Sequence, residues 1–194
     1  MTEERKSPWN SLEVAKLLVT PIVVALLGFF VQTQLAAQAL ATQELLAEQA
    51  RSWQHSQRLA DRRLQLYESI RVDLNKIYCF VEDVGTWKED NPETIISYKR
   101  HIDREMHSNR AIWSTETFQA YLKYMSAAFG TYQGVGKDAQ IATTAIEKKI
   151  GIKNWSAEWE SKLTGKRIPE HKQYYDQLLN LMSRDMSLNS KEGV

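Results

Sequence analysis

The stretch that decides the fold is KLLVTPIVVALLGFFVQTQLAAQALATQ, which runs from Lys16 to Gln43. Its first half is apolar apart from Lys16 and Thr20, and residues 17–43 contain no charged side chain. A soluble helix of this length rarely lacks charges altogether, because its outer face must contact water. About 20 mostly apolar residues suffice for a helix that spans the hydrocarbon core of a bilayer. The sequence therefore predicts one membrane-spanning helix, which we place at residues 11–31.

The ends of this anchor follow from its length. The run from Leu17 to Val31 covers roughly 22 Å as a helix, which is shorter than a hydrocarbon core of about 30 Å. Extension back to Trp9 makes up the difference. Trp9 would then lie among the lipid headgroups, and Lys16 would extend its ammonium group toward them. We expect residues 1–10 to form a short tail outside the bilayer.

Basic residues near the anchor indicate how it is oriented. Arg5, Lys6 and Lys16 lie at its N-terminal side, whereas residues 32–50 contain no Lys or Arg. Because positively charged flanks stay in the cytoplasm, this difference places the body of the protein on the non-cytoplasmic side. The difference is small and arginines resume at Arg51, so the opposite orientation stays open.

Two other interpretations of the apolar stretch also stay open. A secretory signal peptide needs a small-x-small cleavage site, and Ala39-Leu40-Ala41 offers one. Alternatively, the stretch is a core helix of a soluble protein, which would bury the same side chains against the rest of the domain. A retained anchor explains the length of the uncharged stretch better than either alternative.

The segment after the anchor is predicted to continue as a helix. No Gly or Pro occurs between Phe29 and Val84, and residues that favour helices dominate this interval. Such a helix would extend on the order of 80 Å. Gln32 and Gln34 lie on different sides of it, so contact with lipid should end there while the helix continues. We therefore predict a helical stalk over residues 32–58, which would form a rigid coupling between bilayer and body.

A helix of this length requires a packing partner. The apolar residues of the stalk recur nearer every eleven positions than every seven, which favours a straight or right-handed bundle over a leucine zipper. These residues are Leu35, Ala39, Leu46, Ala50, Trp53, Ala60 and Leu64. The partner is either the protein's own body or a second copy of the chain. We expect a homo-oligomer that forms through the stalk and the membrane-spanning helix.

Residues 59–188 are predicted to form an all-α bundle domain, and residues 189–194 a loose tail. The apolar stripe widens from Leu59 onward, as in a helix that faces a core, and Gly85 ends that helix. The sequence contains neither an internal repeat nor a convincing strand alternation. The fold class that these patterns favour is all-α throughout.

Four further helices of this domain have recognisable starts. The start signals are Asn91 followed by Pro92, Ser114, Asp138 and Pro169. The helix that Asp138 begins is predicted to end at Ile150. These signals rest on the preference of Asn, Ser and Asp side chains for the first free backbone N–H groups of a helix, and on the preference of Pro for the first turn.

Composition limits the classes of function. The chain has 194 residues and a net charge of +1, which gives no sign of nucleic-acid binding. Cys79 is its only cysteine, so a disulfide within the chain and a multi-cysteine zinc site are excluded, and we expect a buried thiol. Asp103 and His107 lie one helical turn apart, but no further metal ligand can be identified. We expect no cofactor and no metal.

The densest polar stretch is YKRHIDREMHSNR, and it carries the candidate binding residues. Arg100, Arg104 and His107 fall on one helical face at spacings of four and three residues. Arginines supply charge and paired donors, and histidine can transfer a proton near neutral pH, so this face could bind an anion. The alternative is a solvated face on which Asp103 and Glu105 pair with the basic side chains.

The spacing of Arg100 and His107 is similar to the arginine–histidine motif of HEPN-type all-α ribonucleases. A membrane helix in front of such a domain also resembles the layout of certain membrane-associated CRISPR accessory proteins. The resemblance covers one short motif and this layout. It implies a dimer in which Arg100 and His107 bind and cleave RNA at the interface.

We expect the protein to act without catalysis, by self-assembly or by binding a protein partner at the lipid bilayer. One alternative is an oligomeric pore-forming or membrane-perturbing effector, whose helices would associate around Thr20, Gly28 and Gln32. The other is a HEPN-like membrane-associated ribonuclease that uses Arg100 and His107.

Overall fold

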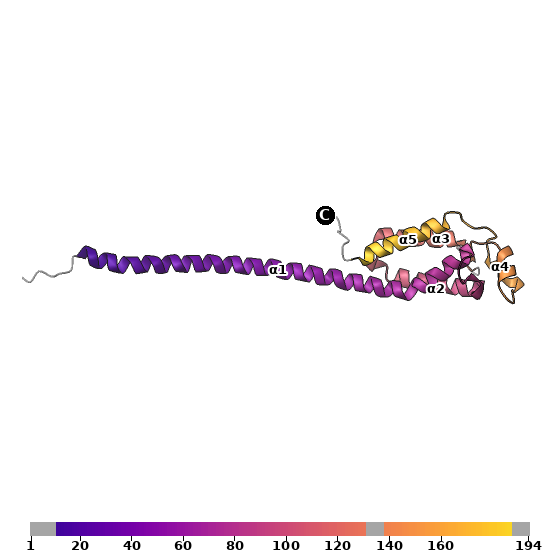
Figure 1. Cartoon of the computed structure of the whole chain (residues 1–194), viewed down its shortest axis with the longest axis horizontal. Helices are drawn as coiled ribbons and strands as arrows, with labels where there is room; N and C mark the ends of the chain where they lie inside the picture. Colours follow the sequence, from indigo (N-terminus) through magenta and orange to yellow (C-terminus); the bar gives the residue numbers. More distant parts are fainter. Residues whose placement is uncertain (1–10, 131–137, 188–194) are drawn as a thin grey trace, which may run out of the picture. The chain divides into compact units, whose positions relative to one another are not determined.

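The computed structural model describes residues 11–130 and 138–187, and these are mostly helical, in agreement with the predicted all-α class (Figure 1). The chain divides into two compact units, which we call unit 1 (Met1–Gln54) and unit 2 (His55–Val194). The core of the described chain lies in unit 2.

Helix α1 runs from Ser11 to Glu82, 72 residues without a break. The glutamine–alanine stretch after Val31 is therefore helical, as the absence of Gly and Pro predicts. Thr33 and Thr42 donate their hydroxyl hydrogens to the helix carbonyls of Phe30 and Gln38, so these polar side chains do not interrupt the helix.

The C-terminal end of α1 is a left-handed cap. Asp83 has a φ of 59°, and the Val84 N–H donates to the carbonyl of Cys79 at 3.1 Å, which is the six-residue bond of a Schellman motif. The sequence predicts that Gly85 ends this helix, but the left-handed position falls on Asp83. Gly85 follows with a φ of 60°, where an added Cβ would lie 3.2 Å from the Cys79 Sγ.

Two helices begin at the caps that the sequence predicts. Helix α2 spans Pro92–Ser108, and the Asn91 Oδ1 accepts a hydrogen bond from the Thr94 N–H at 3.0 Å. Helix α3 spans Thr115–Ala128, and the Ser114 hydroxyl oxygen accepts from the Thr117 N–H at 3.1 Å. Both predicted N-caps are confirmed. The connections contain the short 3-10 helices η1 (Trp87–Glu89) and η2 (Arg110–Ile112).

The predicted helix from Asp138 to Ile150 is wrong in its first half. Phe129–Gly130 (β1) and Gln140–Ile141 (β2) pair as two short antiparallel strands, and α4 covers only Ile146–Gly151. The Ala142 N–H donates to the Ala128 carbonyl, and the Ile141 carbonyl accepts from the Thr164 N–H. The backbone groups after Asp138 are therefore satisfied by distant segments rather than by a helical turn.

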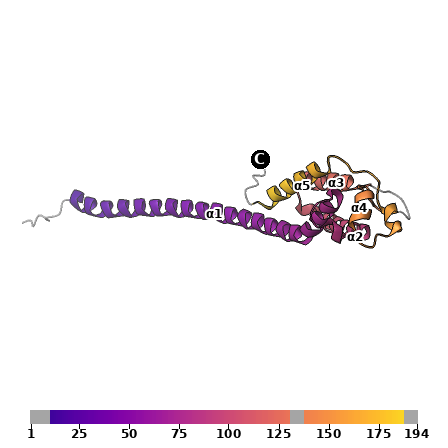
Figure 2. The same ribbon diagram turned by 45° about the vertical axis from the view of Figure 1, so that its right-hand side comes forward.

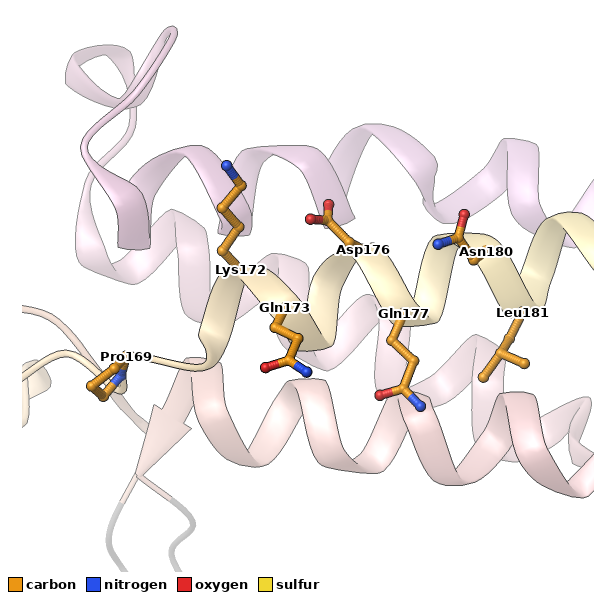
Figure 3. Close-up of a pocket in the computed structure, with 7 residues that line it drawn as sticks. All are labelled: Pro169, Lys172, Gln173, Asp176, Gln177, Asn180 and Leu181. Carbon is orange, nitrogen blue, oxygen red and sulfur yellow. The ribbon is translucent and has the colours of Figure 1, made fainter.

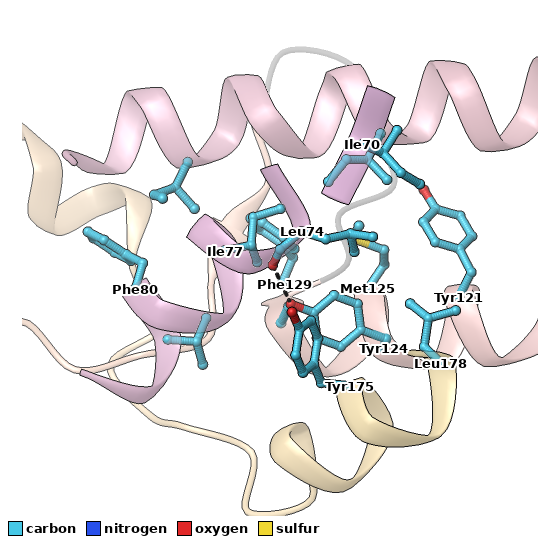
Figure 4. Close-up of a cluster of buried hydrophobic side chains, with 14 of the residues drawn as sticks. Ile70, Leu74, Ile77, Phe80, Tyr121, Tyr124, Met125, Phe129, Tyr175 and Leu178 are labelled. Carbon is cyan, nitrogen blue, oxygen red and sulfur yellow. Dashed lines mark hydrogen bonds between the residues drawn. The ribbon is translucent and has the colours of Figure 1, made fainter. Parts of the chain in front are cut away.

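The remaining elements complete unit 2. The 3-10 helix η3 spans Ala157–Lys162, and α5 spans His171–Met186, close to the start that Pro169 predicts. Helices α3 and α5 pack against each other, and the C-terminal part of α1 contributes to the same core (Figures 2 and 4).

The core of unit 2 confirms the predicted widening of the α1 stripe. Leu66 is buried, with 5% of its surface exposed. The later stripe residues are fully buried: Ile70, Leu74, Ile77 and Val81. They meet α3 and α5 side chains, and the Tyr124 hydroxyl of α3 donates to the carbonyl of Leu74 at 3.5 Å (Figure 4). The core side chains from α3 and α5 are Phe118, Tyr121, Tyr124, Met125, Tyr175, Leu178 and Met182. Cys79 is buried, as predicted.

Candidate functional site

The most apolar part of the described chain is in unit 1. By length and composition, α1 is long and apolar enough to cross a membrane, and its apolar window is not buried in the structure. Val24, Leu26 and Phe29 are 63%, 64% and 67% exposed. Contiguous apolar surface of this kind is rare on a soluble protein, because water contact with it is unfavourable.

The residues predicted to mark the ends of the anchor are described only in part. Val31 is 53% exposed. Trp9 lies outside the described residues, and so do the side chains of Lys16 and Leu17, although the backbone of both belongs to α1.

Three side chains of α2 that the sequence predicts as an anion site have different surroundings in the structure. The Arg100 Nη2 lies 2.8 Å from both carboxylate oxygens of Asp138, an exposed pair of a kind that contributes about 0–1 kcal/mol. The His107 ring packs edge-on against Phe118, with ring centroids 5.3 Å apart. Arg104 is exposed and has no ion-pair partner in the part of the chain that the structure describes. Arg100 is therefore already paired with a carboxylate.

A second group of ionisable side chains is concentrated where α1 ends. Glu82 and Asp83 there meet three basic residues from distant parts of unit 2: Lys148 of α4, Arg167 of the segment before α5, and His171 at the start of α5. We call these five residues the α1-end cluster. The His171 Nδ1 lies 2.8 Å from the Glu82 Oε1, and the Asp83 carboxylate contacts both Lys148 and Arg167.

Lys148 is the most unusual member of the α1-end cluster, because its side chain is fully buried. Its ammonium group donates to Asp83 and to the carbonyl of Phe80, one of the last-turn carbonyls of α1 that have no partner within the helix. The Nζ also lies 4.3 Å from the centroid of the Phe80 ring and 4.5 Å from that of Trp87. Burial lowers the pKa of Lys148, and the hydrogen bond to Asp83 opposes this shift.

His171 is also fully buried, against aromatic rings. Its ring centroid lies 5.1 Å from that of Tyr124 and 5.9 Å from that of Tyr78. Burial lowers the pKa of His171 even though the hydrogen bond to Glu82 raises it, so the neutral ring is favoured. Among the residues that the structure describes, none is a hydrogen-bond partner for its Nε2.

The arrangement of the α1-end cluster is that of a structural clamp. Its carboxylates are each paired with basic groups, and its lysine and histidine are shielded from solvent. The cluster joins the end of α1 to α4 and α5, and it completes the cap that Asp83 begins.

The sequence contains no local signal for the α1-end cluster. The partners lie 65 positions apart in the Lys148–Asp83 pair and 89 in the His171–Glu82 pair. Spacings of three or four residues report contacts within one helix only, so they do not indicate pairs of this kind.

An open depression with a volume of about 740 Å³ runs along the outer face of α5 (Figure 3). The described residues that line it are Pro169, Lys172, Gln173, Asp176, Gln177, Asn180 and Leu181. These are mostly exposed polar side chains on one helix. The depression is open to solvent, whereas most ligand-binding pockets have enclosing walls and converging polar groups.

Within the described residues, no group of three or more His, Cys, Asp or Glu side chains could hold a metal ion. Comparisons of this chain with protein-family models, with curated proteins and with solved structures give no match.

Proposed function

We propose that this protein is anchored in a membrane by a single span over residues 11–31 and acts without catalysis, by self-assembly or by binding a partner at the membrane. The observation that carries the proposal is the exposed apolar surface of α1 from Val23 to Val31. Hydrocarbon lipid tails would cover this surface on all sides, whereas a one-sided protein core would not.

Self-assembly is supported by the part of α1 that follows the proposed span. Leu35, Leu46 and Trp53, which belong to the predicted eleven-residue stripe, are 59%, 60% and 58% exposed. A second copy of the chain would cover this stripe, and a stalk over residues 32–58 would hold the copies together outside the bilayer.

The body over residues 59–188, an all-α bundle in this proposal, is available for partner binding. We place it on the non-cytoplasmic side because Arg5, Lys6 and Lys16 lie at the N-terminal side of the span. A cysteine introduced in the tail at 189–194 would be labelled by an impermeant reagent in intact cells if this orientation is right, and only after permeabilisation if it is reversed.

The span is tested by extracting membranes that contain the full chain with alkaline carbonate. We expect the wild-type chain to stay in the membrane pellet and a Val24→Arg/Leu27→Arg variant to move to the supernatant, because two charges oppose insertion. Val72→Arg is the matched control, since Val72 is 57% exposed on the same helix but lies in unit 2. A wild-type chain that alkaline carbonate releases would contradict the span.

Self-assembly is tested separately by disulfide cross-linking. Leu46→Cys places a thiol on the stripe, and Glu48→Cys places one on the opposite side of the helix, about 200° away. The native Cys79 is buried, so we expect it to form no cross-link. We expect cross-linked dimers from Leu46→Cys only. Equal yields from the two variants, or no dimer from either, would contradict assembly through the stripe.

A further inference from the structure

The two ends of α5 are held in unit 2 by contacts of different kinds. At the C-terminal end, the Arg63 Nη1 donates to the Asp185 carbonyl at 2.7 Å, and the Asp185 carboxylate accepts from a backbone N–H before α3 at 2.9 Å. At the N-terminal end, the Glu170 side chain makes no capping hydrogen bond within the described chain, and His171 joins α5 to Glu82 of α1. Of these contacts, the one made by His171 contains a group that titrates near neutral pH.

The α1-end cluster is electrically balanced while His171 is neutral. Its two carboxylates, Glu82 and Asp83, face two cations. Lys148 contacts Asp83, and Arg167 contacts both carboxylates, with its Nη1 3.6 Å from the Glu82 Oε2. A proton on His171 would therefore add an uncompensated positive charge beside a lysine, and both of these basic side chains are fully buried. Burying such a charge is unfavourable.

The position of the His171 ring opposes its protonation in two further ways. A neutral ring donates its Nδ1 hydrogen to Glu82, whereas the cation also carries a hydrogen on Nε2. That nitrogen is buried and has no partner among the residues that the structure describes, so the added N–H would stay unsatisfied. His171 is also the first residue of α5, where the helix dipole disfavours a cation. Burial lowers the pKa of His171, although the hydrogen bond to Glu82 opposes this shift.

The aromatic residues around His171 carry no charge that could balance a proton on its ring. Tyr78 of α1 and Tyr124 of α3 lie against the ring. Tyr175, one turn further along α5, lies beside Tyr124 with ring centroids 5.4 Å apart (Figure 4). Burial raises the pKa of Tyr124, and it raises that of Tyr175 to about 12, so both phenols stay neutral where histidine titrates. A protonated His171 is therefore stabilised only if the start of α5 moves away from α1 and the ring reaches water.

We propose that His171 is a pH-sensitive switch at the contact between α1 and α5. In acid the protonated ring leaves Glu82, and the first turns of α5 separate from the end of α1. The C-terminal part of α5 stays packed, because Leu178 and Met182 are fully buried and the contacts of Asp185 do not titrate near neutral pH. This switch lies within unit 2 and does not depend on the proposed span.

Hydrogen–deuterium exchange of the full chain in detergent micelles, followed by mass spectrometry, tests the switch. The chain is labelled at pH 7.5 and 5.5, about one unit either side of the ordinary histidine pKa of about 6.5. Labelling times are scaled to the intrinsic exchange rate at each pH. The peptides to compare are residues 171–177 at the start of α5, residues 181–186 at its end, and α3.

We expect the open fraction of residues 171–177 to rise several-fold from pH 7.5 to 5.5. The limit is about tenfold for each unit by which the pKa of His171 is lowered, because the open segment binds the proton at the ordinary pKa. Residues 181–186 and α3 should keep their protection at both pH values, since their contacts do not change.

Two variants assign the response to one histidine. His171→Phe keeps a ring against Tyr78 and Tyr124 but binds no proton, so exchange at the start of α5 should not depend on pH. His101→Gln is the matched control. His101 also pairs with a carboxylate, 2.7 Å from Asp73, but its side chain is 40% exposed, so this variant should respond as the wild type does.

The proposal is overturned if the start of α5 keeps its protection at pH 5.5. It is also overturned if α3 and the end of α5 lose protection to the same extent, because acid then unfolds unit 2 as a whole. A response that persists in His171→Phe, or disappears in His101→Gln, assigns the titration to another group and overturns the role of His171. If His171→Phe does not fold, the comparison between the two ends of α5 in the wild type and in His101→Gln decides.

Discussion

The two parts of helix α1 share a backbone conformation and differ in what surrounds their side chains. In unit 1, Leu27 and Phe30 are 59% and 61% exposed, and from Val23 to Val31 apolar residues occupy every side of the helix. In unit 2, Leu74 and Ile77 are fully buried, and polar residues such as Asn75 occupy the outer side. A helix that is apolar all round needs an apolar environment all round, whereas a one-sided stripe needs only a core. Helix propensity alone does not distinguish the two parts.

The largest expected effect concerns the clamp that holds the unit 2 part of α1 at its end. Lys148→Ala should lower the free energy of unfolding by about 3–5 kcal/mol, because it removes one partner of a buried ion pair and uncaps the Phe80 carbonyl. Lys149→Ala is the control variant at the neighbouring position. The pair of Lys149 with Glu160 is half exposed, so this variant should lower the free energy of unfolding by less than about 1 kcal/mol. Denaturant unfolding of the full chain in detergent micelles measures both. Equal losses would show that the buried cluster is no more important than a surface pair.

The second prediction applies the same substitution to both parts of α1. Leu74→Ala should destabilise unit 2 by about 2–5 kcal/mol, because it leaves a cavity among fully buried side chains. Leu40→Ala should leave the unfolding of unit 2 unchanged, since Leu40 is 62% exposed and belongs to unit 1. The fluorescence of the unit 2 tryptophans follows the transition. A comparable loss from Leu40→Ala would mean that the two parts of α1 are not independent in stability.

The third prediction concerns Asp83, the left-handed residue that directly follows α1. Asp83→Ala loses the contacts with Lys148 and Arg167. It also places alanine in the left-handed region, where a Cβ is unfavourable and no polar side chain compensates. Asp83→Gly loses the same contacts but relieves the backbone, so it should be more stable than Asp83→Ala by about 1 kcal/mol. Thermal unfolding of the two variants gives the difference. If the alanine variant is as stable as the glycine variant, the left-handed cap does not control how α1 ends.

The smallest effect is a dependence of stability on pH. The pKa of His171 is lowered in the folded chain, so the unfolded chain binds a proton first as pH falls below about 6.5. Stability should therefore be complete above that pH and decline below it, until the folded histidine is also protonated.

The His171→Phe variant isolates this contribution, because it keeps a ring against Tyr78 and Tyr124 but has no proton to bind. Between pH 7.5 and 5.5, values about one unit either side of the ordinary histidine pKa of about 6.5, the wild type should lose more stability than the variant. The difference should not exceed about 1.4 kcal/mol for each unit of pKa shift. His55→Gln, at an exposed position, should behave as the wild type does. Identical pH profiles for the wild type and His171→Phe would contradict the neutral buried ring.

Several features of unit 2 were predictable because they depend on neighbours along the chain. Asn91 and Ser114 cap helices whose first N–H groups are three positions away, and the buried stripe of α1 repeats with the helical period. The predicted helix from Asp138 failed because Ala142 finds a backbone partner in Ala128 at the end of α3, and Ile141 finds one in Thr164, in the segment after η3. The residues of the predicted anion face do lie on one helix, α2. The sequence could not predict that Arg100 pairs with Asp138, because these two residues are 38 positions apart.

The sequence by itself determined the unbroken helicity of α1, the uncharged apolar stretch near its start, and which side of its later part faces a core. These follow from propensity and periodicity, which act over a few residues. Only the tertiary structure decided that the left-handed cap after α1 falls on Asp83, that Lys148 and His171 are buried beside it, and that Ile146 and Ile150 project outward. Each of these depends on contacts between segments far apart in the chain, and local patterns carry no information about which distant segments meet.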